Sequence, residues 1–542
     1  MCYYMKRNNA GGEHHEPPAE KTEYFMITRN INEYRTMLER EGLLQSAKGF
    51  QEDCGKRQVT DISYNSILSG EGTLFICKGK NFKGQYLTDA LGKGATGYVA
   101  DERTIAVIES EVPQEMKKNV PVLVINDMRR AISKISAFYF DRSWDKALKI
   151  IGLTGTKGKS TTAAMIKSIL DVHCGREIGF SSGIYNYDGE NREKSVLTTP
   201  ETIELHRILD GCVRNGCPYL VMEVSSQALK YDRTLDLDFE IGGFLNISED
   251  HISEAEHKDM EDYFTSKLKI LDHSRIACVN YDMEREYLDR VLARAGEKCR
   301  KTITFGFREG ADVQGLETEE LTGKIILSVR IKDEEGSYSA EKFTVNIGGG
   351  YNSYNALMAI AASRQLGVPI ETIKKGLETV KVPGRMELYT IPEKSVDIIV
   401  DYAHNKMSYE ALFDYVHKHY PGRRVGFVFG CVGEKAFNRR KEAGEIAEKN
   451  ADFVVITELD PGKEDINKIC QEVLSHIEHK EKARIITNRD EAVEAALKTA
   501  DQLGNCVVVL AGCGTGGHIK RKEGLVEFAT DGERVQRYLA SR

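Results

Sequence analysis

"IGLTGTKGKSTTAAMIKSIL", residues 151–170, is the stretch that decides the fold. The apolar run "LKIIGL" that leads into it is typical of a buried strand, and its second half places apolar residues at helical spacing. Between the two, "TGTKGKS" is a glycine-rich loop. This order favours a phosphate-binding loop, because loop N–H groups and the positive end of the helix dipole both attract an anion. The commonest such loop has a glycine five residues before its Gly-Lys pair, where this chain has Leu153.

The residues of this loop have distinct expected roles. Gly155 and Gly158 let the backbone bend inward, Lys159 reaches the outer phosphates, and the hydroxyl of Ser160 or Thr161 would hold Mg²⁺. The alternative interpretation is a plain glycine turn between a strand and a helix. The residues expected to bind the phosphates of ATP are Gly155, Thr156, Lys157, Gly158, Lys159, Ser160 and Thr161.

Length and composition exclude several classes of protein. A chain of 542 residues predicts three or four domains. Its net charge of −8 and the lack of a basic run argue against nucleic-acid binding. No apolar run approaches the length of a membrane span. The twelve cysteines follow no paired framework, and the N-terminus lacks the apolar core of a signal peptide. We therefore expect a cytoplasmic protein without a membrane or nucleic-acid partner, and a monomer.

Strands alternate with helical segments along most of the chain, which predicts an α/β fold with parallel sheets. One exception, "KIILSVRIKDEEGSYSAEKFTVNI", predicts a hairpin because its alternating residues flank an acidic-glycine turn. We expect a disordered tail over residues 1–23 and three domains over residues 24–146, 147–382 and 383–542.

Seven stretches, in this order along the chain, carry a resemblance to a known family. They are "TGTKGKSTT", "LTTPETIELHRIL", "MEVSSQAL", "NISEDHISEAEHKDMEDYFTSK", "GGGYNSYNALMAIAA", "VPGRMEL" and "DYAHNKMSYEAL". Together they resemble the Mur ligases. The stretch "DISYNSILSGEGTLFICKGKNFKG" is similar to the branch that adds the third residue of the cell-wall peptide. The resemblance implies a small uridine-binding α/β domain, a central phosphate-loop ATPase domain and a C-terminal, Rossmann-like domain that binds an amino acid.

The implied reaction is ATP-dependent amide formation between UDP-N-acetylmuramoyl-dipeptide and a free amino acid. ATP converts a carboxylate into an acyl phosphate, which an amine attacks. By resemblance, the catalytic residues are Lys159, Glu223, His251 and Lys267. The Mg²⁺ ligands would be Ser160, Glu223, His251 and Lys267, the last as a carbamate. Lys269 competes with Lys267 for that role, and a capping Asp250 followed by a surface His251 is the plainer alternative.

Further site residues are also carried over by resemblance. Ser66 would contact the uridine end, while Thr198, Thr199, Ser225 and Arg233 would hold the muramoyl-dipeptide. Asn352, Asn355, Arg385, Asp401 and His404 would complete the ATP site. Three residues depart from the family pattern: Ile67 replaces an arginine, Lys157 an asparagine and Gln227 a histidine.

The stretch "TELDPGKED" bears on which amino acid is added. Relatives that add meso-diaminopimelate read its distal carboxylate with an arginine, and Gly462 stands in that position here. The neighbouring acids Glu458, Asp460, Glu464 and Asp465 favour a side chain that ends in an ammonium. We therefore expect Asp460, Gly462 and Glu464 to select L-lysine or a related diamino acid. Lys463 or Arg439 could still bind a carboxylate, and a solvated loop without a role is the alternative.

Three other functions stay open from the sequence. They are a meso-diaminopimelate-adding ligase, a ligase like the folylpolyglutamate synthetases, and a non-catalytic relative that binds nucleotide. The uridine-binding first domain argues against the second. The presence of Lys159, Glu223, Lys267 and Arg385 argues against the third, which Ile67, Lys157 and Gln227 keep open.

Overall fold

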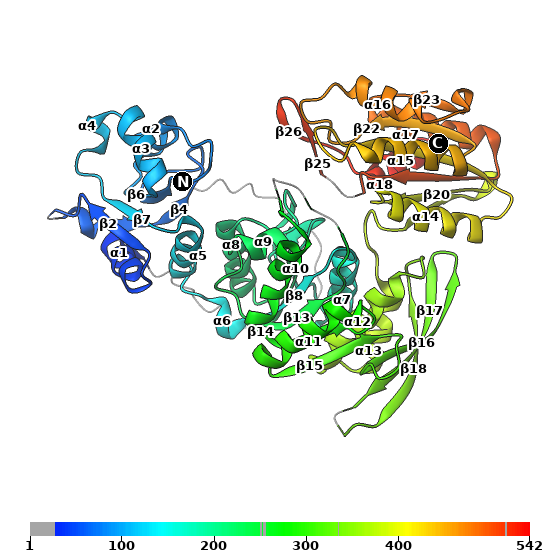
Figure 1. Cartoon of the computed structure of the whole chain (residues 1–542), viewed down its shortest axis with the longest axis horizontal. Coiled ribbons are helices and arrows are strands. Elements are labelled where there is room, and N and C mark those ends of the chain that lie inside the picture. The colour runs from blue at the N-terminus through cyan, green and yellow to red at the C-terminus, as the bar shows by residue number, and fades with distance from the viewer. Residues whose placement is uncertain (1–27, 52, 250–251, 253–255, 334, 515–516) are drawn as a thin grey trace, which may run out of the picture.

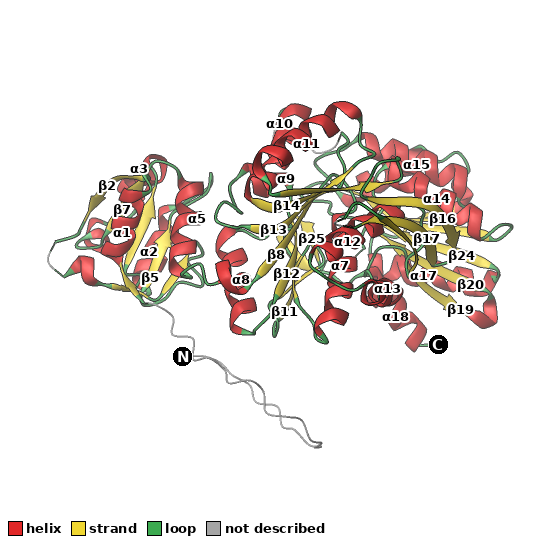
Figure 2. Cartoon of the chain, turned by 90° about the horizontal axis from the view of Figure 1, so that it is seen from below, coloured by secondary structure: helices red, strands yellow, loops and turns green. Residues whose placement is uncertain are grey.

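The computed structural model describes residues 28–51, 53–249, 252, 256–333, 335–514 and 517–542. Within these residues the chain forms three α/β units in chain order, each built on its own mostly parallel sheet (Figure 1). Figure 2 shows the strands as inner layers with helices packed outside them. The predicted α/β class is confirmed. The expected tail at residues 1–23 lies outside the described residues.

The N-terminal unit is a five-stranded sheet in the order β2-β7-β6-β5-β4, parallel except for β2. Helices α1 and α5 cover one face through Ile31 and Ile135, and α2 and α3 cover the other through Leu87 and Ile108. The elements are β1 Arg29–Asn30, α1 Ile31–Arg40, β2 Leu44–Lys48, β3 Gln58–Val59, β4 Asp61–Ser63, β5 Thr73–Ile76, α2 Gly84–Gly92, β6 Gly97–Ala100, α3 Glu102–Glu111, α4 Gln114–Lys117, β7 Val122–Ile125, α5 Met128–Tyr139 and α6 Trp144–Ala147.

The central unit is an eleven-stranded sheet in the order β11-β10-β9-β12-β8-β13-β14-β15-β16-β17-β18. In this sheet β9, β12, β8, β13, β14, β15 and β16 are parallel, whereas β10 and β11 at one edge pair antiparallel. The predicted hairpin is confirmed as β17 and β18. The strands are β8 Lys149–Thr154, β9 Gly179–Ser181, β10 Tyr185–Tyr187, β11 Arg192–Lys194, β12 Tyr219–Glu223, β13 Phe239–Phe244, β14 Ser274–Asn280, β15 Lys301–Gly306, β16 Val313–Leu321, β17 Lys324–Lys332 and β18 Tyr338–Val345.

Side chains that alternate along β8 divide the central core into two layers, as a strand buried on both faces requires. Ile151 and Leu153 face a cluster with α7, α12 and α13, whereas Ile150 faces a cluster with α8 and α11. The helices are α7 Lys159–Cys174, α8 Thr202–Arg214, α9 Ser226–Lys230, α10 Met260–Leu268, α11 Arg285–Lys298, α12 Asn352–Gln365 and α13 Ile370–Thr379.

The C-terminal unit is a six-stranded sheet in the order β19-β20-β24-β21-β22-β23, in which only β19 is antiparallel. Its core contains a fully buried ion pair between Arg489 and Asp531, at 2.6 Å. The elements are β19 Glu387–Ile391, β20 Val396–Asp401, α14 Lys406–His419, β21 Arg424–Cys431, α15 Asn438–Asn450, β22 Phe453–Glu458, α16 Ile466–Ser475, β23 Ala483–Ile485, α17 Arg489–Leu503, β24 Cys506–Ala511, β25 His518–Arg521, β26 Gly524–Glu527 and α18 Asp531–Ala540.

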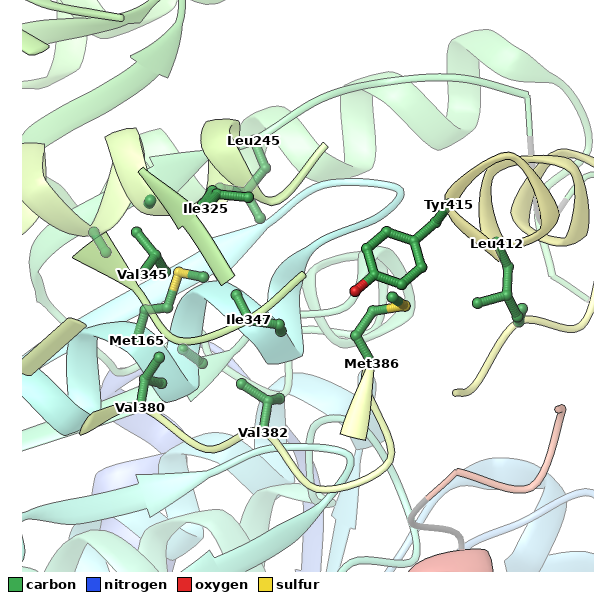
Figure 3. Close-up of a cluster of buried hydrophobic side chains, with 14 of the residues drawn as sticks. Met165, Leu245, Ile325, Val345, Ile347, Val380, Val382, Met386, Leu412 and Tyr415 are labelled. Carbon is green, nitrogen blue, oxygen red and sulfur yellow. The ribbon is translucent and has the colours of Figure 1, made fainter. Parts of the chain in front are cut away.

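The central and C-terminal units share a buried apolar cluster. Ile347 and Val382 lie beside Met386, Leu412 and Tyr415 in this cluster (Figure 3). The Tyr415 hydroxyl also accepts a hydrogen bond from the Gly323 N–H at 2.8 Å. The turn between β16 and β17 is thereby fixed against α14.

The N-terminal and central units meet through charged side chains. Asp236, which is buried, accepts hydrogen bonds from Lys134 at 2.7 Å and from Arg142 at 3.0 Å. Lys78 reaches Glu201, directly before α8, at 2.8 Å. Among the described residues, no helix combines the length and apolar character that a membrane crossing needs.

Candidate active site

The phosphate loop lies at the carboxyl end of β8, and α7 begins directly after it at Lys159. Gly158 has a φ of 86°, and a Cβ atom there would lie 2.3 Å from Oδ1 of Asn355. Only glycine fits such a position, because the backbone is left-handed and the neighbouring amide is close. The sequence prediction of a strand, a glycine loop and a helix is confirmed.

Asn246, which the sequence analysis did not single out, braces this loop. The Lys157 N–H donates to Oδ1 of Asn246 at 2.9 Å, and Nδ2 of Asn246 donates to the Lys157 carbonyl at 3.0 Å. The Thr156 N–H donates to the Asn246 carbonyl at 3.2 Å. Asn246 follows β13, the neighbour of β8. A polar amide directly after a buried strand was the available signal.

The two asparagines assigned to ATP form a chain below the loop. Oδ1 of Asn355 accepts from the Thr162 hydroxyl at 3.1 Å, and Nδ2 of Asn355 donates to Oδ1 of Asn352 at 2.8 Å. Both are buried. These contacts hold α12 against the start of α7, directly after the phosphate loop.

Two lysine side chains converge on Gly155. Nζ of Lys159 donates to the Gly155 carbonyl at 2.8 Å, and Nζ of Lys267 donates to the same oxygen at 2.9 Å. Lys267 is 1% exposed, whereas the side chain of Lys269 is 46% exposed and lies 3.8 Å from Asp232. Of the two candidate lysines, Lys267 is therefore the one that reaches the phosphate loop. Ser160 and Thr161 occupy the first turn of α7.

Glu223 ends β12 beside this loop, since it pairs in register with Leu153 of β8. Its carboxylate is 2% exposed and accepts the Gly183 N–H at 2.9 Å. Among the described residues, no Lys, Arg or His side chain forms an ion pair with it. A buried carboxylate that forms no ion pair costs free energy, which a bound cation would offset. His251 lies outside the described residues.

The residues assigned to the dipeptide gather next to Glu223. The Thr199 hydroxyl donates to the Glu223 carbonyl at 3.0 Å and accepts the Ser225 N–H at 2.9 Å. Arg233 donates to the Thr199 carbonyl at 3.2 Å and pairs with Glu201 at 2.5 Å. The structure therefore brings these predicted residues together. Thr198 also lies here, with its hydroxyl 3.6 Å from where a Cβ on Gly183 would stand, and Gln227 lies in α9.

Ser66 lies apart from this group, in the N-terminal unit. Its carbonyl accepts a hydrogen bond from Lys93 at 2.6 Å, and its neighbour Ile67 is 80% exposed. The N-terminal side chain that reaches the central group is Lys78, through Glu201. The sequence analysis did not name Lys78 or Glu201 as site residues.

Arg385, Asp401 and His404 meet at the carboxyl edge of the C-terminal sheet. The Arg385 guanidinium lies over the Tyr402 ring, 4.3 Å from its centre. The His404 ring packs edge-on against the same tyrosine, at 4.8 Å between ring centres. Asp401 accepts the N–H groups of Met386 and Ala403 at 2.9 and 2.8 Å. Burial raises the pKa of the Asp401 carboxyl, and the Arg385 charge and these two hydrogen bonds oppose the rise.

The acidic side chains near Gly462 are present as expected, but each has partners within the protein. Glu464 receives two hydrogen bonds from Arg440, at 2.8 and 2.7 Å, and Glu458 pairs with Arg521 at 2.8 Å. Oδ1 of Asp460 accepts the Lys520 N–H at 2.8 Å. Asp465 caps α16. Two of the four acids are therefore ion-paired and the other two accept backbone N–H groups, so this loop is not a bare acidic rim.

Gly462 itself has a structural reason to be glycine. Its φ is 62°, and a Cβ atom there would lie 2.3 Å from Oε2 of Glu434, which pairs with Lys520 at 3.2 Å. The glycine is thus required by its backbone as well as by any choice of amino acid.

Fold and site together define an α/β enzyme with a phosphate-binding loop beside a buried lysine and a buried carboxylate. Residues 153–363 match the Mur ligase middle domain, and residues 384–514 match the Mur ligase, glutamate ligase domain. The chain belongs to the Mur ligase family, and it is a ligase.

Relatives that cover most of the chain carry specific names. The UDP-N-acetylmuramoyl-L-alanyl-D-glutamate–L-lysine ligase of Enterococcus faecalis is 36% identical over 90% of this chain and 94% of its own length. A UDP-N-acetylmuramyl-tripeptide synthetase of Lactococcus lactis is 36% identical over 88% and 92%.

Solved structures support the fold. MurF of Acinetobacter baumannii has a TM-score of 0.63 at 18% identity, covering 95% of this chain and 99% of its own. A UDP-N-acetylmuramoyl-L-alanyl-D-glutamate–2,6-diaminopimelate ligase has a TM-score of 0.60 at 19% identity, with the same coverage. At these identities the likeness concerns the fold alone.

Proposed function

We propose that this ligase joins L-lysine, or a related diamino acid, to UDP-N-acetylmuramoyl-L-alanyl-D-glutamate with consumption of ATP. The observation that carries the proposal is the convergence of Lys159, Lys267 and Glu223 at the ends of two adjacent strands. The names of relatives at 36% identity support the choice of substrates. The enzyme would work in the cytoplasm.

The proposed reaction has two steps. A carboxylate oxygen of the dipeptide attacks the γ-phosphorus of ATP, which gives an acyl phosphate and ADP. The amine of the incoming amino acid then attacks the acyl carbon, phosphate leaves, and the nitrogen loses a proton. The first step brings two negative groups together, and the second develops negative charge on the acyl oxygen beside a phosphate, so positive charge has to be placed at the site.

The residues of the chain supply that charge. Loop N–H groups and Lys159 would bind the phosphates, while Thr199, Ser225 and Arg233 would hold the dipeptide beside Glu223. The buried carboxylate of Glu223 fits a Mg²⁺ ligand, and the Ser160 hydroxyl in the first turn of α7 would be a second. When bound, Mg²⁺ would neutralise charge on the transferring phosphoryl group. Asn352, Asn355, Arg385, Asp401 and His404 stay proposed as the rest of the ATP site.

Lys267 is proposed to act as a carbamate. This modification turns an ammonium into an anion, which would suit a metal site. The burial of Lys267 beside the phosphate loop supports this role. We expect Lys267→Ala to lose ligation and to regain part of it when a short carboxylic acid is added. Lys269→Ala is the matched control and should stay active, because Lys269 is half-exposed and lies on Asp232.

The test of the whole proposal is ADP release by the purified protein with ATP, UDP-N-acetylmuramoyl-dipeptide and single amino acids. We expect release to require both substrates and kcat/KM to be highest for L-lysine among L-lysine, L-ornithine and meso-diaminopimelate. A preference for meso-diaminopimelate would contradict the assigned amino acid. ADP release with a folate substrate instead would contradict the muramoyl substrate. No ADP release with any of these substrates would favour a non-catalytic relative that binds nucleotide.

A further inference from the structure

Tyr263 of α10 is fully buried and touches the phosphate loop, the catalytic lysine and a buried histidine. Its hydroxyl donates to Oγ1 of Thr156 at 3.2 Å. Nζ of Lys267, one turn further along the helix, lies over its ring at 4.4 Å from the centre. His257 packs against the same ring edge-on, at 5.1 Å between ring centres. One side chain therefore contacts several parts of the proposed site.

The donor hydrogen and both acceptor positions of the Thr156 hydroxyl each have a hydrogen-bond partner. It donates to the Ser248 carbonyl at 3.2 Å and accepts the Ser248 N–H at 3.1 Å. A hydroxyl has one donor hydrogen and two acceptor positions, so its second acceptor position is used by the Tyr263 hydroxyl. Tyr263 is thus a donor that fixes the phosphate loop to α10, while Ser248 fixes the loop to the segment after β13.

His257 fixes the other side of the Tyr263 ring. It is buried, and its Nε2 lies 3.0 Å from the Ser226 hydroxyl in α9, just after the strand that carries Glu223. Its Nδ1 lies 3.3 Å from Asp262, which also pairs with Lys230 at 2.6 Å. Packing between His257 and Thr156 leaves the ring little freedom to turn away from Lys267.

We propose that Tyr263 is a positioning residue: its ring holds the end of the Lys267 side chain beside the phosphate loop, and its hydroxyl fixes the loop at Thr156. The proposal rests on the proposed function, because it assigns Tyr263 to the same ATP and lysine site. The two halves of the side chain act on different steps. The hydroxyl affects ATP binding, and the ring affects the step that needs Lys267.

Two substitutions separate these halves. Tyr263→Phe keeps the ring and removes the hydroxyl, so KM for ATP should rise roughly fivefold while kcat stays within about twofold. Tyr263→Leu also removes the ring against which Lys267 packs, and kcat should then fall about tenfold or more because the end of the Lys267 side chain is no longer held in place. Phe264→Leu is the matched control, because Phe264 is a buried aromatic on the same helix that packs on Phe244 and Tyr287. It should lower the melting temperature and leave the KM for ATP and kcat unchanged.

Measurements without turnover keep this inference separate from the proposed reaction. Tyr263→Phe should weaken binding of a non-hydrolysable ATP analogue by the same factor. In buffer freed of CO2 and bicarbonate, where Lys267 is an amine, cyanate should label Lys267 faster in Tyr263→Leu than in the wild type, Tyr263→Phe or Phe264→Leu. If the wild type is inactive in ligation but the two Tyr263 variants still show these effects, the proposed reaction is contradicted and the role of Tyr263 is supported. Unchanged analogue binding, or equal labelling in Tyr263→Leu and Phe264→Leu, would overturn the role of Tyr263.

Discussion

The phosphate loop and the loop at Asp460 occupy equivalent places in two sheets but are held by different forces. Each follows a buried parallel strand, β8 in one case and β22 in the other, and each needs a glycine at positive φ. The phosphate loop is braced by uncharged amides from Asn246 and Asn355. The Asp460 loop is held by ion pairs from Arg440 and Arg521. Bracing by uncharged groups leaves the phosphate loop able to receive phosphate charge, whereas ion pairs neutralise two of the acids around Asp460.

The largest expected effect concerns the phosphate loop. Lys159→Ala would remove the proposed charge-assisted contact to phosphate, and contacts of this kind are worth about 1.5–3 kcal/mol. ATP binding should weaken by roughly 10- to 150-fold, and ligation should be lost, while the unfolding transition stays unchanged. Isothermal titration with ATP and a coupled ADP assay measure both.

Lys157→Asn is the matched control for Lys159→Ala, because it removes the other lysine of the same loop. Lys157 is fixed to Asn246 through its backbone, which the substitution leaves in place. Turnover should stay within about threefold of the wild type, since the phosphate contacts expected at this position come from the backbone and the family pattern has asparagine here. Equal losses in the two variants would contradict the specific role of Lys159.

The contrast between the loops also explains what the sequence could predict. The phosphate loop has its strand, glycines, lysine and helix start within twenty consecutive residues, so local pattern was sufficient. Its brace, Asn246, comes from a strand about ninety residues away, and only the sheet order makes them neighbours.

The Asp460 loop shows the limit of that approach. Its acids were visible in the sequence, but Arg440 and Arg521 approach from α15 and β25. Which acid pairs with which base depends on tertiary packing, so the pairs could not be predicted from the row of acidic residues alone. The glycine at position 462 was equally ambiguous as a sign of which amino acid is added. Its left-handed backbone requires glycine whichever amino acid is bound.

The second prediction concerns the ion pairs that Arg440 forms with Glu464 and Glu472. Arg440→Met leaves Glu464 and Glu472 without their buried partner, whose side chain is 2% exposed. Removing one member of a buried pair costs about 3–5 kcal/mol, and the partial exposure of the carboxylates reduces this to roughly 2–3 kcal/mol. Urea unfolding of the C-terminal unit should show the loss, with ATP binding unchanged. Arg285→Met, which removes an exposed i,i+4 pair with Asp289, should cost less than about 0.5 kcal/mol.

The third prediction compares the two left-handed glycines. Gly158→Ala places a Cβ atom 2.3 Å from Asn355, which is fixed on both sides, whereas Gly462→Ala meets the end of the Glu434 side chain, which can move. Each substitution should destabilise the protein by about 1 kcal/mol, because an alanine is strained in the left-handed backbone conformation. Gly158→Ala should also weaken ATP binding. Gly422→Ala, at φ 72° with open space around it, gives the backbone cost alone. If Gly462→Ala proves the more damaging to ligation, the loop at Asp460 is the stiffer of the two.

The smallest effect is a pH dependence of the Asp460 loop. The hydrogen bonds from Arg440 lower the pKa of Glu464 below its usual 4.5. A lowered folded-state pKa stabilises the protein at pH values above the unfolded pKa, and that stabilisation is lost as the pH falls through the folded pKa. The stability difference between wild type and Arg440→Met should therefore be constant from pH 7 to about pH 5 and shrink below about pH 4.5. Urea unfolding of both proteins across this range measures it. A difference that stays constant down to pH 3 would mean that Arg440 stabilises the loop by packing and not by its charge.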